Sequence, residues 1–416
     1  MIFKYSILDR MRSTASKKRS QGVSSNRKVR SPRQKKLSVL GEGSYGCVVK
    51  PAIKCKENIK VNGKVSKLMT LDDAKKELGE YEFISKIPGY EEYTLPVPQL
   101  CTPKLSEHGT VLKNIFDQSK PGHCRNKRLL ALHKSKIDNF EAGFSDKKDS
   151  FHEKMLGLPD RMIFTSLLFE NGGLDLGKLL DPNKPPILKG QTLKKFLTAI
   201  LKLIRGLHFF RENDILHKDI KLSNIVYKIS TNEIKYIDFG RSTKLSTLIS
   251  ERNNNEHELD TKKLPNYNLL EYKRTENKKI WEWYKICQEH RTRATGMTRE
   301  EINEKTARTI DSCSLATYLV YMFELLEMKK MIISKTIYEF QQIFEKYFID
   351  DVKSRSDDLD GLYKSYEKLL MKHGLFDDSP QTTTNSDSDA DLDLDLDFDS
   401  HLNSHSYSDS DSDSDS

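Results

Sequence analysis

Side chains that could take part in catalysis are concentrated in the stretch 215–224, which reads ILHKDIKLSN and lies between two apolar segments. Asp219 is followed five residues later by Asn224. On one extended loop, this spacing lets a carboxylate face a substrate hydroxyl while an amide oxygen faces a metal ion. Lys221 lies between them. The stretch therefore predicts a site that combines a base and a metal ligand.

A second carboxylate follows fourteen residues after Asn224, in the sequence Asp238-Phe239-Gly240. It ends an apolar segment that we expect to be a strand, and the glycine permits a turn directly behind it. A carboxylate in this position is suited to holding Mg²⁺ on a triphosphate. Asn224 and Asp238 are therefore the predicted metal ligands.

A glycine-rich turn reads GEGSYGCV over residues 41–48. Glycine lets the backbone approach phosphate oxygens and present N–H groups to them, where a side chain would block the way. Dinucleotide-binding folds share the G-x-G-x-x-G pattern, but there it runs from a strand into a helix, whereas here it joins two predicted strands. The predicted nucleotide contacts are Gly41, Glu42, Gly43, Ser44, Gly46 and Val48.

Two lysines compete for a place behind this turn. Lys54 lies only eight residues past Gly46, too few to complete one strand, turn and enter the next. Lys67 lies in the segment KVSKLM, which we expect to be the third strand because it follows the turn at residues 62–63. We therefore expect Lys67, and not Lys54, to lie on the third strand of the predicted sheet.

A helix is predicted over residues 72–87, after an acidic start. It offers two carboxylates as partners for Lys67. Glu80 is preferred, because Phe83, Ile84 and Ile87 follow it at the spacing of a buried stripe, and Glu77 is the alternative.

In this order, the motifs resemble those of the eukaryotic-type serine/threonine protein kinases. Residues 217–224 stand where that family has H-R-D-x-K-x-x-N, and residues 238–240 resemble its D-F-G. The resemblance covers roughly residues 37–375. It implies an α+β, two-lobed fold, with a small antiparallel β-rich N-lobe that carries one helix and a larger, mainly helical C-lobe. It also implies transfer of the γ-phosphoryl group of ATP to Ser or Thr hydroxyls of protein substrates, with Mg²⁺ or alternatively Mn²⁺.

The resemblance assigns a role to each polar residue. Asp219 would orient or accept the proton of the hydroxyl, Lys67, fixed by Glu80, would bind the α- and β-phosphates, and Lys221 would steady the transferred group. Asp311 resembles the buried aspartate that organises the catalytic loop. His217 is expected to pack beneath the turn at 238–240.

The sequence FENGGLD at 169–175 resembles the hinge between the lobes. Adenine would bond to the backbone of Glu170 and Asn171, and Asp175 belongs to the same nucleotide site. The amino-acid sequence of this hinge is similar to that of haspin-like kinases. Together with a repetitive Ser-Asp tail, it makes the kinases of large DNA viruses the nearest likeness.

The sequence also departs from the family. Lys218 replaces an arginine and lacks the planar fork that binds a phosphorylated loop bidentately, so control by loop phosphorylation is not expected. The A-P-E motif is replaced at best by residues 269–271, a poor match. Thr243 and Ser246 are candidate phosphorylation sites.

Charge divides the chain into regions. The formal net charge of +8 hides twelve basic residues against one acidic residue in 1–36, and thirteen Asp without Lys or Arg in 377–416. We therefore expect a disordered basic arm at 1–36, an N-lobe at 37–169 with an insertion at about 103–160, a C-lobe at 170–375 with an insertion at about 241–310, and a disordered acidic tail at 376–416. An acidic or nucleic-acid partner would suit the basic arm.

The six cysteines contain no C-x-x-C pair, and we interpret them as neither a disulfide framework nor a zinc site, which favours a reducing compartment. The most apolar segment, 315–328, is too short and too amphipathic for a membrane span. We therefore expect a soluble, monomeric, intracellular protein in the host cytoplasm, virus factory, virion or nucleus. The alternatives to a protein kinase are a non-catalytic scaffold with this fold and a phosphotransferase acting on small molecules.

Overall fold

The computed structural model describes residues 37–43, 45–104, 115–117, 119, 123–133, 164–254, 296–349 and 351–378. The predicted basic arm lies outside these ranges, and so does the acidic tail beyond residue 378. Most of both predicted insertions also lies outside them.

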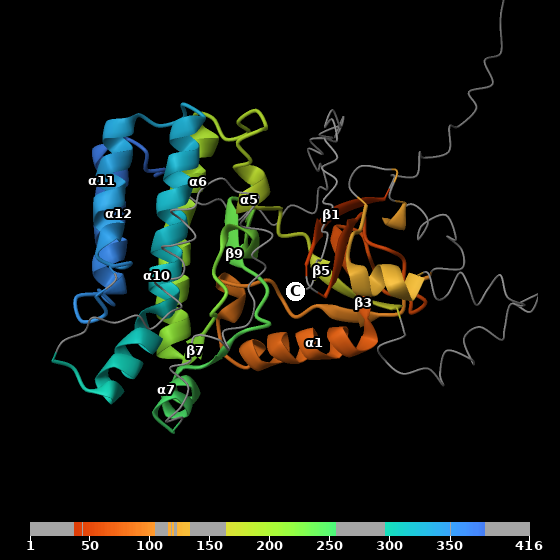
Figure 1. The fold of residues 1–416 in the computed structure, drawn as a ribbon. Coiled ribbons are helices and arrows are strands. Elements are labelled where there is room, and N and C mark those ends of the chain that lie inside the picture. Colours follow the sequence, from red (N-terminus) through yellow and green to blue (C-terminus); the bar gives the residue numbers. More distant parts are fainter. Residues whose placement is uncertain are drawn as a thin grey trace, which may run out of the picture. The chain divides into compact units, whose positions relative to one another are not determined.

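The N-terminal part of the described chain is built on a five-stranded antiparallel sheet (Figure 1). The strand order is β1-β2-β3-β5-β4. As predicted, the glycine-rich turn joins two antiparallel strands, and a third strand follows the turn at 62–63. The strands are β1 (Ser38–Glu42), β2 (Gly46–Lys50), β3 (Lys64–Thr70), β4 (Gln99–Cys101) and β5 (Phe164–Glu170).

Both faces of β3 and β5 are buried, because alternate side chains enter different apolar clusters. Met69 of β3 and Leu167 of β5 pack in the main core together with Tyr81. Leu68 and Phe164 point to the opposite face and pack there with residues of the segment 115–133. A sheet covered on two sides is a firm support for the residues that line its edges.

Helix α1 (Leu71–Ser85) follows β3 directly. The hydroxyl of Thr70 accepts a hydrogen bond from the backbone N–H of Asp73, and Asp72 and Asp73 lie in the first turn, where the helix dipole favours negative charge. The predicted helix is thus confirmed, two residues shorter at its C-terminal end than expected.

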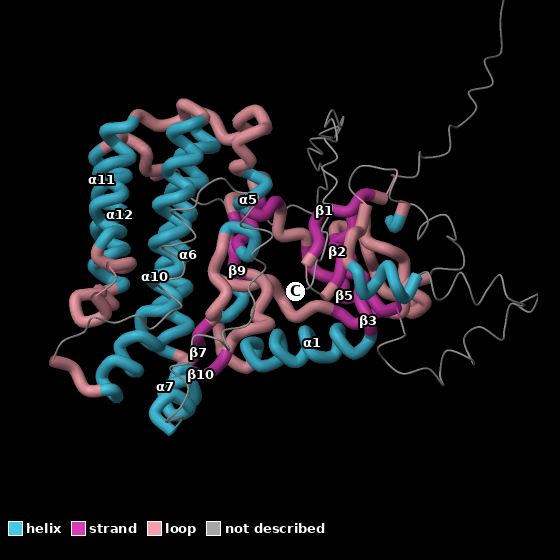
Figure 2. Tube along the Cα trace, in the orientation of Figure 1, coloured by secondary structure: helices cyan, strands magenta, loops and turns pink. Residues whose placement is uncertain are grey.

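The C-terminal part is mainly helical, as Figure 2 shows. Its described helices are α5 (Leu176–Leu179), α6 (Gln191–Glu212), α7 (Leu245–Asn254), α10 (Arg299–Met328), α11 (Ser334–Glu345) and α12 (Leu359–Lys372), with 3-10 turns η1 (Tyr90–Glu92) and η4 (Leu222–Asn224). Helices α6, α10, α11 and α12 pack together, and short strands lie between them and the first sheet. The strands are β6 (Leu174–Asp175), β7 (Ile215–Leu216), β8 (Ile225–Lys228), β9 (Glu233–Tyr236) and β10 (Thr243–Lys244).

The apolar residues of α6 recur at helical spacing and are buried, so this helix forms the centre of the helical part. Helix α10 begins earlier than its apolar stretch suggests. Thr298 and Glu301 form a capping box, in which each side chain bonds the backbone N–H of the other residue. Residues 299–310, which we assigned to an insertion, are therefore the first turns of α10.

The two parts are joined by hydrogen bonds as well as by packing. The backbone N–H of Tyr236 in β9 donates to the carbonyl of Tyr93, at 2.8 Å, and the ammonium of Lys235 donates to the carbonyl of Glu91, at 2.9 Å.

The hinge after β5 requires glycine at 173, because a Cβ there would lie 2.1 Å from the carbonyl oxygen of Tyr227. The predicted α+β architecture is confirmed.

The interpretation of the cysteines is wrong. Disulfides join Cys47 to Cys124 and Cys55 to Cys101, and Cys313 is also disulfide-bonded. The first two pairs are separated by 77 and 46 residues, so sequence spacing gave no sign of them. The cysteines therefore no longer favour a reducing compartment.

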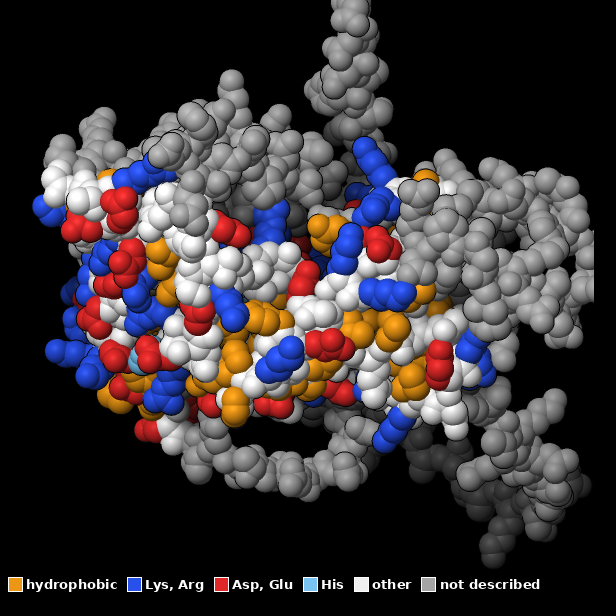
Figure 3. Space-filling model, turned by 90° about the horizontal axis from the view of Figure 1, so that it is seen from below, with side chains coloured by type: hydrophobic (Ala, Val, Ile, Leu, Met, Phe, Trp, Pro, Cys, Tyr) orange, Lys and Arg blue, Asp and Glu red, His pale blue; other side chains and the backbone are white. Residues whose placement is uncertain are grey.

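No helix in the described ranges is both long enough and apolar enough to cross a membrane. Seen from below the view of Figure 1, the described surface mixes acidic, basic and apolar side chains (Figure 3). This mixture is usual for a surface in contact with water.

Candidate active site

The loop that follows β7 brings three of the predicted residues together. Asn224 donates hydrogen bonds from its amide nitrogen to Oδ2 of Asp219, at 2.8 Å, and to the carbonyl of Asp219, at 2.9 Å. The ammonium of Lys221 lies 3.3 Å from the same Oδ2. The second oxygen, Oδ1 of Asp219, is buried and accepts no hydrogen bond from the described residues. An unpaired buried carboxylate oxygen is costly, and such an atom is expected where a ligand supplies the partner.

His217 and Asp311 hold this loop from below. The carboxylate of Asp311, in α10, accepts the backbone N–H groups of His217, at 2.6 Å, and of Lys218, at 2.9 Å. The ring of His217 is fully buried; its Nε2 lies 3.1 Å from the carbonyl of Ile237, and its Nδ1 accepts the N–H of Asp219. His217 therefore packs as predicted, and its ring nitrogens are occupied by the backbone.

Asp238 lies opposite this loop, at the end of the segment after β9. Its φ of +65° is in the left-handed region, a costly conformation for a residue other than glycine. Burial opposes ionisation, but the ammonium groups of Lys67 and Lys221 outweigh it and hold the pKa of Asp238 below its ordinary value. Asp238 is therefore held as a carboxylate.

Aromatic rings connect this turn to both parts of the fold. The ring of Phe239 lies 4.6 Å from that of His217 and 5.8 Å from that of Tyr81 in α1, between ring centres. The backbone N–H of Asp238 is also within 3.5 Å of the hydroxyl of Tyr81. A shift of α1 would therefore displace the turn that carries Asp238.

Lys67 lies at the centre of the sheet, between Val48 of β2 and Leu167 of β5 in the strand register. Its ammonium lies 2.7 Å and 2.5 Å from the two carboxylate oxygens of Glu77. Burial lowers the pKa of Lys67, but the carboxylates of Glu77 and Asp238 outweigh it, so the pKa lies above its ordinary value. The rival lysine, Lys54, is exposed in the loop after β2.

The preference for Glu80 as the partner of Lys67 is wrong, and Glu77 takes this place. Glu77, Tyr81 and Ile84 share the buried face of α1, whereas Phe83 is only partly buried and Ile87 lies beyond the end of the helix. The face of α1 that meets the sheet is thus rotated from the one that we inferred.

Glu80 nevertheless lies near the site. A Cβ built on Gly240 would be 3.4 Å from a carboxylate oxygen of Glu80 and 3.3 Å from Oδ1 of Asp238. Burial, together with the charges of Glu77 and Asp238, raises the pKa of Glu80 to about 7. Glu80 is therefore a half-buried carboxyl group that titrates near neutral pH.

The glycine-rich turn lies at the edge of the sheet near β2. The N–H of Gly43 donates to the carbonyl of Gly46, at 2.9 Å, which closes the turn. Glycine is required at 46, since a Cβ there would lie 2.4 Å from the carbonyl oxygen of Leu68. A Cβ on Gly41 would lie 3.2 Å from the ammonium of Lys178 in α5, so the turn faces the helical part. Ser44 lies outside the described residues. The carboxylate of Glu42 accepts a hydrogen bond from the backbone N–H of Arg125, at 2.7 Å.

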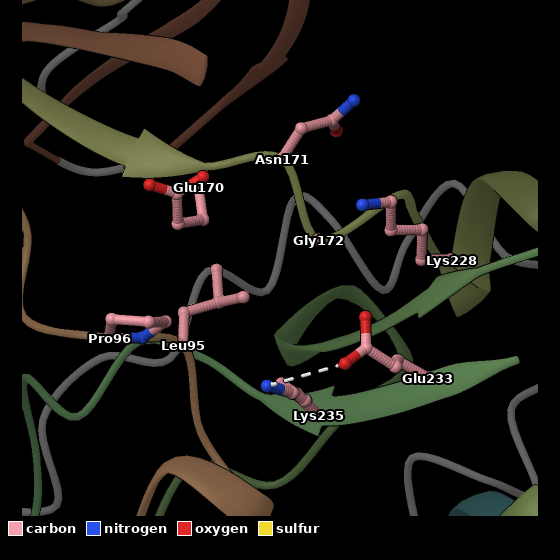
Figure 4. Close-up of a pocket in the computed structure, with 8 residues that line it drawn as sticks. All are labelled: Leu95, Pro96, Glu170, Asn171, Gly172, Lys228, Glu233 and Lys235. Carbon is pink, nitrogen blue, oxygen red and sulfur yellow. Dashed lines mark ion pairs between the residues drawn. The ribbon is translucent and has the colours of Figure 1, made fainter. Parts of the chain in front are cut away.

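The hinge residues line a separate pocket of about 220 Å³ (Figure 4). Among the described residues that line this pocket, Lys67, Asp219 and Asp238 do not occur. The side chain of Glu170 pairs with Lys64, at 3.1 Å. The lining residues are Leu95, Pro96, Glu170, Asn171, Gly172, Lys228, Glu233 and Lys235.

Asp175 begins α5. One of its carboxylate oxygens accepts the backbone N–H of Lys178, at 2.9 Å, and the other pairs with the ammonium of the same residue. The carboxylate therefore caps the helix, and a nucleotide would have to compete with Lys178 for it.

The two candidate phosphorylation sites follow the turn at 238–240. Thr243 pairs with Leu216 in the β10–β7 ladder. The hydroxyl of Ser246 donates to the carboxylate of Asp214, at 2.6 Å, so a phosphate there would meet a negative charge. Residues 269–271 lie outside the described ranges.

The donor set fits a nucleotide with a divalent metal. Mg²⁺ prefers oxygen ligands, which Asp238 could supply from its carboxylate and Asn224 from its amide oxygen, since the amide nitrogen is engaged by Asp219. Lys67 and Lys221 would offset phosphate charge. Protein kinase domains in general use ATP and a divalent metal in such an arrangement.

Comparison with known proteins points to the same fold. The family model described as "Protein kinase domain" matches residues 154–281. The chain is also similar to cyclin-dependent kinase 4 of Ovis aries, Mus musculus and Rattus norvegicus, with 38% identity over 81 residues in each case. These matches cover 20% of this chain and 25% of each relative, so the chain spans about a quarter of the length of these relatives. With the described architecture, the family match identifies a two-lobed protein-kinase fold.

Proposed function

We propose that the protein is a serine/threonine protein kinase that transfers the γ-phosphoryl group of ATP to protein hydroxyls with Mg²⁺, or Mn²⁺ as the alternative ion. The observation that carries the proposal is the buried Oδ1 of Asp219, which has no partner among the described residues while Oδ2 is held by Asn224 beside Lys221. A carboxylate fixed by one oxygen and open at the other is suited to receive a hydroxyl proton.

The proposed step uses the residues in defined roles. Asp219 accepts the proton of the Ser or Thr hydroxyl through Oδ1, while the hydroxyl oxygen bonds to the γ-phosphorus and the bond to the β–γ bridging oxygen breaks, releasing ADP. Lys221 offsets charge on the phosphoryl group during transfer, and Lys67, fixed by Glu77, holds the α- and β-phosphates. Asn224 and Asp238 would hold the metal, which would supply positive charge against the phosphate oxygens. Catalysis is thus positioning and electrostatic stabilisation.

The preference for Ser and Thr over Tyr rests on Lys221, two residues after Asp219. The likeness to haspin-like and large-virus kinases rests on the hinge sequence and the Ser-Asp tail, and a location in a host cytoplasm, virus factory or virion rests on that likeness. Binding of an acidic or nucleic-acid partner by residues 1–36 rests on their charge. The lobe limits at 37–169 and 170–375 and the monomeric state remain part of the same proposal.

The test is transfer of label from [γ-³²P]ATP to mixed protein acceptors, followed by phosphoamino-acid analysis, for wild type and Asp219→Ala. We expect label on Ser and Thr, dependent on Mg²⁺ and lost in the variant. Label on small acceptors such as aminoglycosides, but never on protein, would indicate a small-molecule phosphotransferase. Nucleotide binding with equal, background labelling in both proteins would indicate a scaffold.

A further inference from the structure

Residues 123–133 belong to the predicted N-lobe insertion but pack tightly on the sheet. Residues 127–133 are helical, and Leu129 and Leu132 are buried against Leu68 and Phe164. They cover the face of the sheet opposite to α1. We call residues 123–133 the clamp segment.

The clamp segment is attached to the glycine-rich turn at three points. A disulfide joins Cys124 to Cys47, the residue after Gly46. The backbone N–H of Arg125 donates to the carboxylate of Glu42, at 2.7 Å. The amide nitrogen of Asn126 donates to the carbonyl of Gly43, at 2.9 Å. The hydrogen bonds hold the end of β1 at Glu42 and the first residue of the turn, Gly43. The disulfide holds β2, the strand that follows the turn.

The same segment also holds the start of α1. Nη1 of Arg128 lies 3.0 Å and 3.1 Å from the two carboxylate oxygens of Asp73, which is buried. Asp73 lies one turn before Glu77, the partner of Lys67. The side chain of Arg128 is half exposed and the carboxylate of Asp73 is buried, so solvent screens this contact less than a pair exposed on both sides. The hydroxyl of Thr70 donates to the same carboxylate, at 2.7 Å, so Arg128 and Thr70 together hold the start of α1.

We propose that the clamp segment positions the glycine-rich turn and α1 for nucleotide binding, with Asn126 and Arg128 as positioning residues. The proposal rests on the function proposed above. Ordering a glycine-rich turn around phosphate costs conformational entropy, and attachment to a packed segment meets part of this cost before the nucleotide arrives.

Asn126→Asp tests the contact with the turn. Oδ1 of Asn126 accepts the backbone N–H of Leu129, at 3.1 Å, and so caps residues 127–133; aspartate keeps this acceptor but has no donor for Gly43. We expect the Kd for MgATP, measured by calorimetry, to rise about fivefold, the effect of one lost hydrogen bond, with kcat and the Tm close to wild type. An unchanged Kd would overturn the role of Asn126.

Arg128→Ala and Arg128→Lys test the contact with α1. Because Asp73 is held by a single nitrogen of the guanidinium, lysine can restore the contact. We expect kcat to fall in the alanine variant and to recover in the lysine variant. Equal kcat in all three proteins, or a loss that lysine does not restore, would overturn the role of Arg128.

A matched pair of disulfide variants provides the control. Cys47→Ser/Cys124→Ser removes the attachment of the clamp segment, whereas Cys55→Ser/Cys101→Ser removes a second disulfide of the same sheet, between the loop after β2 and β4. We expect a raised Kd for MgATP only in the first variant. An equal rise in both would show a general loss of stability and overturn the clamp. Should the first variant not fold, Asn126→Asp still decides.

Binding and transfer separate the clamp from the proposed function. Wild type that binds MgATP without labelling protein, together with weakened binding in Asn126→Asp, would refute the kinase and support the clamp. Wild type that labels protein, with unchanged binding and kcat in the Asn126 and Arg128 variants, would support the kinase and refute the clamp.

Discussion

The amide nitrogen of Asn224 is shared between Oδ2 and the backbone carbonyl of Asp219, at 2.8 Å and 2.9 Å. This geometry predicts that Asn224 both aligns Asp219 and ligates the metal. Asn224→Ala should lower kcat about 100-fold and raise the Mg²⁺ concentration needed for half-maximal rate, measured by steady-state assay at varied Mg²⁺. Asn224→Asp keeps an oxygen ligand but loses both donors, so it should lower kcat with a smaller effect on the Mg²⁺ requirement. An unchanged kcat in both variants would exclude this role.

The position of Lys67 predicts a large effect for its removal. Lys67→Met deletes a buried ammonium that faces Glu77 and Asp238, and should lower kcat about 100-fold, as measured with labelled ATP. Lys54→Met is the matched control, because Lys54 is exposed and lies in the loop after β2. Equal activity in the two variants would show that Lys67 does not contact phosphate.

The two carboxylates of α1 should differ in their effect on activity. Glu77→Gln breaks a buried ion pair and leaves the charge of Lys67 without its partner, so kcat should fall and the free energy of unfolding should drop by about 3 kcal/mol. Glu80→Gln should retain a kcat close to that of wild type. Steady-state kinetics and urea unfolding measure the two effects, and the reverse order would restore the assignment made from sequence.

The raised pKa of Glu80 predicts a dependence of stability on pH. A carboxyl group whose pKa is higher in the folded than in the unfolded protein binds its proton more tightly when folded, so stability falls as pH rises from the ordinary glutamate pKa to about 7. Glu80→Gln abolishes this loss. Because Glu80 is only half-buried, we expect a gain of about 1 kcal/mol at pH 8 and none at pH 4.

Urea unfolding of wild type and Glu80→Gln at the two pH values measures this difference. Glu82→Gln, at an exposed position of the same helix, is the control and should show no such gain. A gain of equal size at pH 4 would mean that the substitution acts through packing and not through titration.

The short polar motifs could be predicted because each residue works with near neighbours. Asp219, Lys221 and Asn224 lie on one loop, so their relation depends on local backbone geometry alone. The same holds for the glycine-rich turn and for the third strand that carries Lys67. Thr298 and Glu301 have the spacing of a capping box, so the start of α10 could also have been predicted from the local sequence.

The features that sequence reasoning missed depend on packing between distant segments. Glu77 and Glu80 differ only in which face of α1 meets the sheet, and this is set by the burial of Tyr81 against Phe169 and Phe239. The disulfides join residues that strand pairing and the clamp segment bring together. Arg128 gives no sign in the sequence that it reaches Asp73, 55 residues away.

The most direct test of the central claim is Mg²⁺-dependent transfer of phosphate from ATP to protein by wild type and Asp219→Asn, with MgATP binding measured in parallel. Asparagine keeps the size of the side chain but cannot accept a proton at the same position. Transfer to Ser and Thr should fall by about 100-fold or more while the Kd for MgATP stays within about twofold. Equal transfer by the two proteins would contradict the assignment of Asp219 and the mechanism built on it.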